Sequence, residues 1–417
     1  MSNLTIELSY ALDTFYFLMC TVLVMWMAAG FAMLEAGLVR SKNTVEILNK
    51  NALLYGIACV AYLLVGYNIM YPANPVSSVI PGLDFLLGAD NTIESVTAGG
   101  EDAPYYSNMA DFIFQAVFAA ATMSIVSGAV AERMRLWPFL IFAVVMVSVI
   151  YPVEGYWKWG GGFLDELGFQ DFAGSVVVHM AGAAAALAAV ILVGPRKGKY
   201  GPNGQVRAIP GANLPMATLG MFILWMGWFG FNGGSELKIA NVEEANAVAK
   251  IFVNTNAAAA AGMVVAALFA RTLFGKTDLT MTINGALAGL VAITAEPLAP
   301  DAGTASLIGG VGGLVVVLSV LALDKLKLDD PVGAISVHGA AGIWGIFAVL
   351  ISNPDATFMG QLIGTAVTFA WMFIASYIVL LIIKATMGLR ASEEEEMEGM
   401  DVYECGMEAY PEFTSGK

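Results

Sequence analysis

The sequence predicts an all-α polytopic membrane protein with about eleven transmembrane helices. Helices 1–5 and 6–10 form an inverted repeat, and a long eleventh helix follows. Three observations predict this fold: the composition, the spacing of the apolar runs, and a repeat around two histidines. Of the 417 residues, 58% are hydrophobic and only 13% are charged, more apolar surface than a soluble protein could bury. The charged residues gather between apolar runs that approach the roughly 20 residues needed to cross a hydrocarbon core.

Turn and charge signals between the apolar runs delimit the expected helices. The spans centre on residues 9–37, 50–71, 111–131, 137–153, 174–194, 212–233, 248–273, 280–295, 304–323, 333–352 and 361–388. Several of them, such as the eighth, are rich in glycine and alanine, which suits helices buried among other helices. The chain start lacks the basic segment of a cleaved signal peptide, so we expect the first run to stay as a helix. We therefore divide the chain into a transmembrane domain, 1–388, and a cytoplasmic C-terminal tail, 389–417.

Lysine and arginine alternate between the loops. The loops after the odd-numbered spans hold most of them, and only Lys158, Lys238 and Lys250 fall on the other side. By the positive-inside rule, the N-terminus lies outside and the C-terminus in the cytoplasm. We expect a multi-pass protein of the plasma (inner) membrane.

The chain contains two histidines, His179 and His338, each inside an expected span. VVVHMAGAAAAL surrounds the first and AISVHGAAGIWG the second, and each follows an aspartate, Asp171 or Asp330, by eight residues. Corresponding positions five spans apart indicate a duplicated unit. Because five is odd, the second copy crosses the membrane with opposite polarity, which brings the two histidines together near the middle.

A histidine on an apolar face is more often a satisfied core residue than a functional one. Within a membrane, however, an ionisable group costs about 3 kcal/mol and is a functional candidate by default. Two imidazoles can line a narrow passage and hydrogen-bond a small polar solute. A metal site fits less well, because no buried carboxylate or thiolate supplies the remaining ligands. The three cysteines, Cys20, Cys59 and Cys405, show neither metal-ligand spacing nor a disulfide framework.

No cofactor is expected, and neither a nucleophile with a base nor a nucleic-acid motif supports an enzyme or a nucleic-acid partner. The glycines between Gly309 and Gly313 superficially suggest a phosphate loop. They follow no strand–helix pattern, so close helix packing is the better interpretation.

Several blocks together resemble the ammonium transporter (Amt/Mep/Rh) family, closest to bacterial or archaeal Amt proteins, over essentially the whole chain. The blocks are AGFAMLEAGLVRSKN (29–43), FQAVFAAAT (114–122), DFAGSVVVH (171–179), GWFGFNGGS (227–235), DDPVGAISVHG (329–339) and GLRASEEEEMEGMD (388–401). The resemblance implies a homotrimer, with a pore in each subunit, that conducts ammonium or ammonia; methylammonium is an analogue. The resemblance to Amt proteins favours electrogenic uptake. The alternative function is an ammonium sensor with little flux.

The resemblance also implies site residues. Phe114, Trp159 and Ser235 would form an outer recruitment site, in which aromatic faces and a hydroxyl replace part of the water around a cation. Trp159 alone would equally suit an interfacial anchor. Asp171 would hold this site together and favour the cation, while its position before a helix also suits an N-cap.

Phe118 and Phe231 resemble the stacked pair that closes the pore, although ordinary core packing is the alternative for each. Phe118 is one turn from Phe114, so both can face one lumen. His179 and His338 would line the pore and relay a proton. Only ammonium can shed a proton, so an apolar constriction that penalises charge passes ammonia and rejects potassium.

The tail carries family-like positions at Gly388, Glu393 and Asp401. The resemblance implies that a nitrogen-regulatory protein of the PII class can block this face. A solvated charged tail is the alternative.

Overall fold

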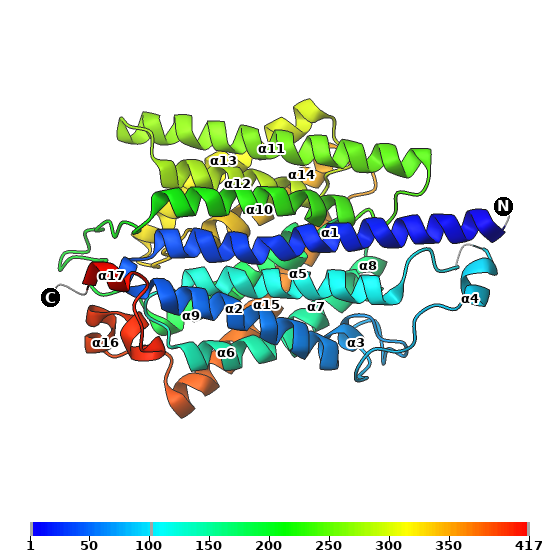
Figure 1. Ribbon diagram of the computed structural model, residues 1–417. Helices are drawn as coiled ribbons and strands as arrows, with labels where there is room; N and C mark the ends of the chain where they lie inside the picture. Colours follow the sequence, from blue (N-terminus) through cyan, green and yellow to red (C-terminus); the bar gives the residue numbers. More distant parts are fainter. Residues whose placement is uncertain (1–2, 101–102, 415–417) are drawn as a thin grey trace.

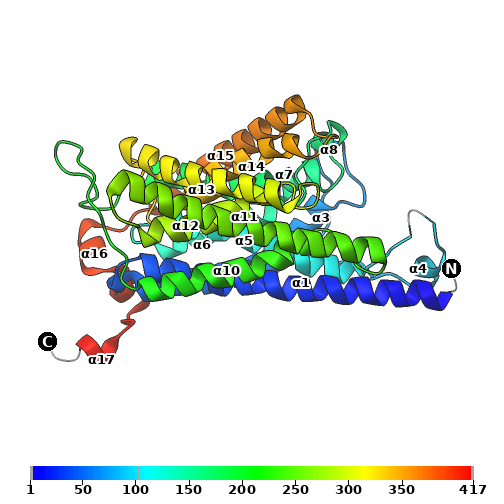
Figure 2. The same ribbon diagram turned by 90° about the horizontal axis from the view of Figure 1, so that it is seen from above.

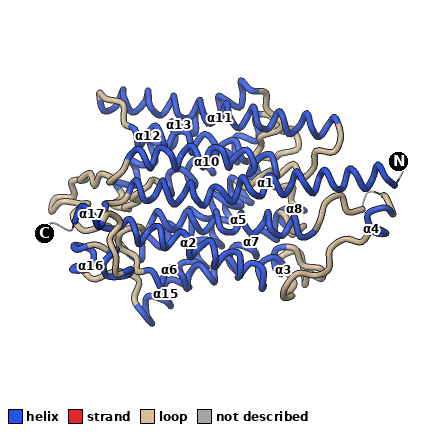
Figure 3. The backbone as a smooth tube through the Cα atoms, viewed as in Figure 1, coloured by secondary structure: helices blue, strands red, loops and turns tan. Residues whose placement is uncertain are grey.

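The computed structural model describes residues 3–100 and 103–414. Residues 1–2, 101–102 and 415–417, the last three of which end the predicted tail, lie outside the described part. Within it, every regular element is a helix, and pairing of the strand type is limited to two isolated bridges. The long helices form one bundle along a common direction, with the two termini at opposite ends (Figure 1). Loops gather at the same two ends (Figure 3).

In the described residues the bundle consists of eleven segments, several of them built from consecutive elements. Those of the first half are α1 Asn3–Leu38, α2 Thr44–Ala61 with η2 Tyr62–Gly66 and α3 Tyr67–Met70, α5 Asn108–Ala129, α6 Leu136–Val145 with η3 Met146–Ile150 and α7 Tyr151–Lys158, and η4 Ser175–Met180 with α9 Ala181–Val193. Those of the second half are α10 Leu214–Gly234, α11 Val242–Phe274, α12 Leu279–Thr294, α13 Ala302–Lys325, η5 Ile335–Ala340 with α14 Ala341–Ala348 and η6 Val349–Ile351, and finally α15 Phe358–Met387. The short elements are η1 Ser41–Asn43, α4 Ile93–Thr97, α8 Phe163–Glu166, α16 Glu393–Glu398, η7 Asp401–Cys405 and α17 Pro411–Thr414.

The predicted spans correspond one for one to these segments. In the described residues, nine helices are long and apolar enough to cross a membrane, and two shorter apolar helices, 279–294 and 335–351, fill the eighth and tenth positions. The all-α polytopic fold is therefore confirmed. The glycine- and alanine-rich eighth helix, α12, is buried from Ile283 to Thr294, as predicted.

Side-chain caps explain where several of these helices begin. Ser107 accepts hydrogen bonds from two backbone N–H groups at the start of α5, Asp278 does so for α12, and Thr357 caps α15 through the N–H of Gly360. Such caps satisfy backbone donors that have no partner within the helix.

The two histidine-bearing segments have the same local structure. Each begins as a six-residue π-helix that follows a glycine with positive φ. Gly174 directly precedes η4, and Gly333 lies two positions before the first residue of η5. The Asp171 carboxylate accepts the N–H groups at the start of η4, and the Asp330 carboxylate accepts those of Gly333 and Ile335 before η5. This repeated construction accounts for the matching sequence around both histidines.

Small residues allow close contact between the helices of the second half. Gly309 and Gly313 of α13 pack directly on the backbone of Ala258 and Gly262 of α11, where a Cβ atom on either glycine would overlap it. The packing interpretation of these glycines is confirmed. Viewed from above, α11 and α13 run beside one another (Figure 2).

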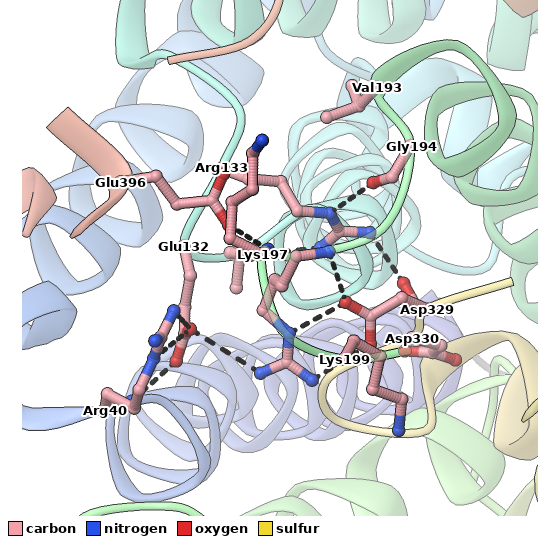
Figure 4. A network of polar contacts seen from close by, with 12 residues as sticks. Arg40, Glu132, Arg133, Val193, Gly194, Lys197, Lys199, Asp329, Asp330 and Glu396 are labelled. Carbon is pink, nitrogen blue, oxygen red and sulfur yellow. Dashed lines mark hydrogen bonds and ion pairs between the residues drawn. The ribbon is translucent and has the colours of Figure 1, made fainter. Parts of the chain in front are cut away.

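An ion network lies at the end of the bundle that carries the C-terminal tail (Figure 4). The Arg196 side chain donates to both carboxylate oxygens of Asp329, at 2.9 and 3.0 Å, and lies 3.6 Å from Glu132. Arg40 donates to Glu132 at 2.7 Å, and Arg133 donates to the carbonyl oxygens of Asp329 and Gly194. Burial alone would raise the pKa of Asp329, but hydrogen bonds from Arg196 and the charges of Arg133 and Arg196 outweigh it and hold that pKa well below its usual range.

The tail is attached to this end of the bundle. Glu395 pairs with Arg135 at 2.8 Å, and Glu396 accepts hydrogen bonds from Arg390 and from the backbone N–H of Lys197. Backbone hydrogen bonds also join Leu389 and Ala391 to the loop after α5. A freely solvated tail is therefore wrong for this stretch.

Candidate functional site

An outer cavity of about 370 Å³ opens at the end of the bundle opposite to the tail. Its walls include all three residues predicted for recruitment, Phe114, Trp159 and Ser235. The complete lining is Tyr71, Tyr106, Asp111, Phe114, Gln115, Phe118, Trp159, Phe172, Ser235 and Leu237. Aromatic faces, the Asp111 carboxylate and the Ser235 hydroxyl therefore converge on a single space, a combination that can replace part of the hydration shell of a small cation.

Helix geometry and one anchoring bond position this lining. Phe114 and Phe118 stand one turn apart on α5, with ring centroids 4.6 Å apart. The Trp159 ring meets Phe118 edge-on at 6.1 Å, and its indole N–H donates to the carbonyl oxygen of Asp171 at 3.2 Å. The Ser235 hydroxyl donates to the carbonyl oxygen of Phe231 at 2.8 Å, which leaves its lone pairs as acceptors.

Asp171 does not line the outer cavity. Asp171 is 1% exposed. Its two carboxylate oxygens accept hydrogen bonds from the backbone N–H groups of Gly174, Ser175, Val176 and Val177. The Asp171 side chain thus satisfies backbone donors at the start of η4, although Gly174 occupies the N-cap position itself. Its predicted part in binding would act through the Trp159 indole.

Phe118 and Phe231 close the inner side of the outer cavity. Their rings stack with centroids 3.9 Å apart and an interplanar angle of 16°. Both side chains are almost fully buried. A charged solute cannot pass here without losing its water, whereas parting of the two rings would admit a small neutral one.

His179 and His338 meet behind the stacked phenylalanines. Their Nδ1 atoms lie 3.2 Å apart and their rings stack at 5.1 Å. His179 also stacks on Phe231 at 5.2 Å, so the outer cavity, the phenylalanine pair and the histidine pair form one continuous series. His179 Nε2 has no hydrogen-bond partner in the protein, which leaves it available to a solute.

Trp228 supports the histidine pair and was not predicted. Its ring stacks on His179 at 4.8 Å, and its indole N–H donates to Thr294 at 2.7 Å. Thr294 in turn donates to Asn232, which donates to Thr255. This chain of bonds fixes the Trp228 ring and with it one face of His179. Trp228 lies in the block 227–235, three residues before Phe231, so helical spacing was the signal that could have found it.

A small inner cavity lies on the far side of the histidine pair. With about 10 Å³ of space it has room for about one water. Phe31, Glu35, Asn284 and His338 are among its lining residues, and the Phe31 and His338 rings lie 6.1 Å apart. Neither Glu35 nor Asp111 of the outer cavity was predicted, although an acidic residue inside an apolar span is itself a signal.

The three tail residues do not join the pore. Gly388 ends α15 with φ +78°, Glu393 pairs with Lys197 at 2.9 Å on the surface, and the Asp401 carboxylate accepts the N–H of Glu46 at the start of α2. In the described residues no cluster of three or more histidine, cysteine, aspartate or glutamate side chains could hold a metal.

Comparison with known proteins agrees with this arrangement. The sequence pattern of the Ammonium Transporter Family matches residues 15–410. Ammonium transporter Amt2 of Archaeoglobus fulgidus is 40% identical over 432 residues, covering 96% of this chain and 89% of that protein. The ammonium transporter of Bacillus subtilis is 34% identical, covering 95% of this chain and 98% of that protein.

Solved structures agree as well. A sensor Amt protein has a TM-score of 0.87 at 34% identity, covering 96% of this chain and 99% of that chain. Candida albicans Mep2 has a TM-score of 0.81 at 28% identity, covering 97% and 92%. The chain therefore belongs to the ammonium transporter family, whose members are multi-pass membrane transporters of ammonium rather than enzymes.

Proposed function

We propose that the chain recruits ammonium as a cation in the outer cavity, removes one proton, and conducts neutral ammonia past Phe118 and Phe231 and along the two histidines, with net transfer of the proton. The observation that carries this proposal is the unbroken series of rings from the outer cavity to the inner one. The rings of Phe118, Phe231, His179, His338 and Phe31 follow one another with centroid separations of 3.9, 5.2, 5.1 and 6.1 Å.

Recruitment in the outer cavity uses the faces of Phe114 and Trp159 and the hydroxyl oxygen of Ser235. A desolvated cation–π contact contributes about 2 kcal/mol, so two faces offset a useful part of the dehydration cost. Asp111 adds a negative charge on the same wall. Asp171 contributes by holding the Trp159 indole through its carbonyl oxygen.

Selection takes place at Phe118 and Phe231. Potassium and ammonium both carry one charge, and an unpaired charge pays a large desolvation penalty between the two rings. Ammonium avoids that penalty by crossing as ammonia, with its proton transferred separately, which potassium cannot do. The neutral ammonia then hydrogen-bonds to the histidine pair, which is otherwise enclosed by apolar rings.

In this proposal the released proton moves separately from ammonia and is relayed between the two histidines. Because two Nδ1 atoms at 3.2 Å are within hydrogen-bond reach, one ring can hand a proton to the other without reorienting. The transport cycle would then move net positive charge. The N-terminus outside and the C-terminus in the cytoplasm are parts of this proposal, supported by the distribution of lysine and arginine. The proposal also includes the plasma (inner) membrane location and the domain division at residue 388, where α15 ends.

We also propose a homotrimer with a pore in each subunit, and a PII-class regulatory protein as a partner of the tail-side face. Gly388, Glu393 and Asp401 would belong to that face. The alternative function is an ammonium sensor with little flux. The similarity to the solved structure of a sensor Amt protein is the observation that favours it.

Purified protein in liposomes distinguishes these functions. An ammonium step should give an inward positive current, methylammonium a smaller one, and potassium none. Binding of ammonium with no current and no change in internal pH would favour the sensor and overturn the transport mechanism.

A further inference from the structure

Glu35 is a buried carboxyl group to which the transport mechanism above gives no part. It lies on α1 with 1% of its surface exposed. It lines the inner cavity together with His338, on the opposite side of the histidine pair from the recruitment site. An acidic side chain inside a membrane-spanning helix is costly, and such residues commonly mark ion or proton routes.

The hydrogen bonds around Glu35 suit both of its protonation states. The Ser127 hydroxyl lies 2.6 Å from Glu35 Oε1 and 2.8 Å from the carbonyl oxygen of Ser124. When Glu35 is ionised, Ser127 donates to it. When Glu35 is protonated, its O–H can donate to Ser127, which then donates to Ser124. Asn51 donates to Glu35 Oε2 at 3.0 Å in either state. Gain and loss of a proton therefore leave no buried polar group unpaired.

The inner cavity offers a path from the histidine pair to this carboxyl group. His338 and Glu35 share its wall, and the cavity has room for about one water. Asn284 lines the same wall, and its Oδ1 atom has no hydrogen-bond partner in the protein. A water held there can donate to Asn284 while it bridges His338 and Glu35.

The surroundings of Glu35 contain few other charges. Lys50 and Glu46 of α2 are the charged groups that act on it, and they pair with each other at 2.7 Å. The groups facing it from α5 are the neutral Ser124 and Ser127, and those across the cavity are His338 and Asn284. Among the residues that line the inner cavity, Glu35 is thus the acidic one, and it shares the wall with His338.

We propose that Glu35 is the proton acceptor on the tail side of the histidine pair. In this step the N–H bond of protonated His338 breaks, and the proton passes to the cavity water. That water releases one of its own protons to the Glu35 carboxylate, where an O–H bond forms, and the imidazole returns to its neutral state. Glu35 later releases the proton to solvent on the tail side. The inference rests on the proposed proton-coupled conduction and names its exit residue.

The test compares current with ammonia uptake in liposomes containing the full chain. Glu35→Gln keeps the shape but cannot take the proton, so the current should fall about a hundred-fold, the loss typical of a missing proton-transfer group. Solute uptake, followed with radiolabelled methylammonium, should fall much less, so the ratio of charge to solute drops. Glu35→Asp keeps a carboxylate and should retain a ratio close to that of the wild type.

Glu154→Gln is the matched control, because Glu154 is also a fully buried carboxyl group of a spanning helix but is absent from the walls of both cavities. It should keep the wild-type ratio. Asn284→Ala leaves Glu35 in place and removes the acceptor for the bridging water, so its ratio should also drop. If Glu35→Gln fails to fold, the charge-to-solute ratio of Asn284→Ala tests the role of Glu35 in its place.

The outcomes separate the two proposals. A wild-type protein that gives no ammonium current overturns the proposed conduction mechanism itself. A normal wild-type current together with an unchanged ratio of charge to solute in Glu35→Gln, or in Asn284→Ala if the former is unfolded, overturns the role of Glu35 alone.

Discussion

The Nδ1 atoms of His179 and His338 lie 3.2 Å apart, although 159 positions separate the two residues in the chain. A hydrogen bond at this distance needs a hydrogen on one Nδ1 and a lone pair on the other. The two neutral rings are then opposite tautomers, so one ring presents Nε2 as an acceptor and the other presents Nε2–H as a donor. A solute that moves along the pair meets both kinds of partner.

Opening the stacked rings should weaken selectivity. In Phe231→Ala we expect a potassium current without ammonium, because water can enter the constriction and lower the desolvation penalty. The matched control is Phe142→Ala, which removes an equally buried ring of α6 that lines neither cavity. Both variants should lose about 3–5 kcal/mol of stability, the usual cost of deleting a buried phenylalanine ring. Potassium currents that are absent from both would contradict the gate role of Phe231.

Removing the charge of Asp111 should weaken recruitment. The half-saturating ammonium concentration of Asp111→Asn should rise about ten-fold, because a carboxylate on the cavity wall attracts a cation by on the order of 1–2 kcal/mol. The maximal current should change little. Asp90→Asn serves as the control, since Asp90 binds Ser107 and Asn108 and does not line the cavity. Equal half-saturation in both variants and the wild type would argue against a part for Asp111.

The depressed pKa of Asp329 predicts how stability depends on pH. The Asp329 contribution is complete above the unfolded pKa of about 3.9 and is lost as pH falls towards the folded value. Thermal unfolding of Asp329→Asn in detergent should show a loss of about 3–5 kcal/mol at pH 7, because Arg196 is left buried without its partner. That difference should shrink only below about pH 4. A difference that already narrows between pH 7 and 5 would contradict the assignment.

Two substitutions in the tail should lower the free energy of unfolding by different amounts. Asp401→Ala removes the cap on α2 and should cost about 1 kcal/mol. Glu393→Ala removes an exposed ion pair with Lys197, and such pairs contribute only about 0–1 kcal/mol. Chemical unfolding of the two variants compares them directly. An equal, negligible effect of both would indicate that the tail is not held to the bundle in solution.

The membrane spans could be predicted because a hydrocarbon core demands long apolar helices, and the charged loops between them orient the chain. The histidine pair could be predicted because duplication leaves matching sequence at His179 and His338. The sequence did not predict that π-helical turns carry both histidines, since π geometry has no propensity signal of its own.

Asp111, Glu35 and Trp228 were also missed. Asp111 and Glu35 stand on helices with apolar residues on every side, so periodicity does not say which face meets a cavity. Trp228 could equally have faced lipid. The attachment of the tail depends on contacts such as Glu395 with Arg135, which join positions 260 residues apart and arise only in the folded chain.

The most direct test of the central claim measures current and proton movement together in liposomes that contain the wild type or the His179→Ala, His338→Ala double variant. The proposed mechanism predicts an ammonium-triggered current in the wild type, and a weakened current or altered selectivity in the double variant. A normal, ammonium-selective current without the two imidazoles would contradict the mechanism.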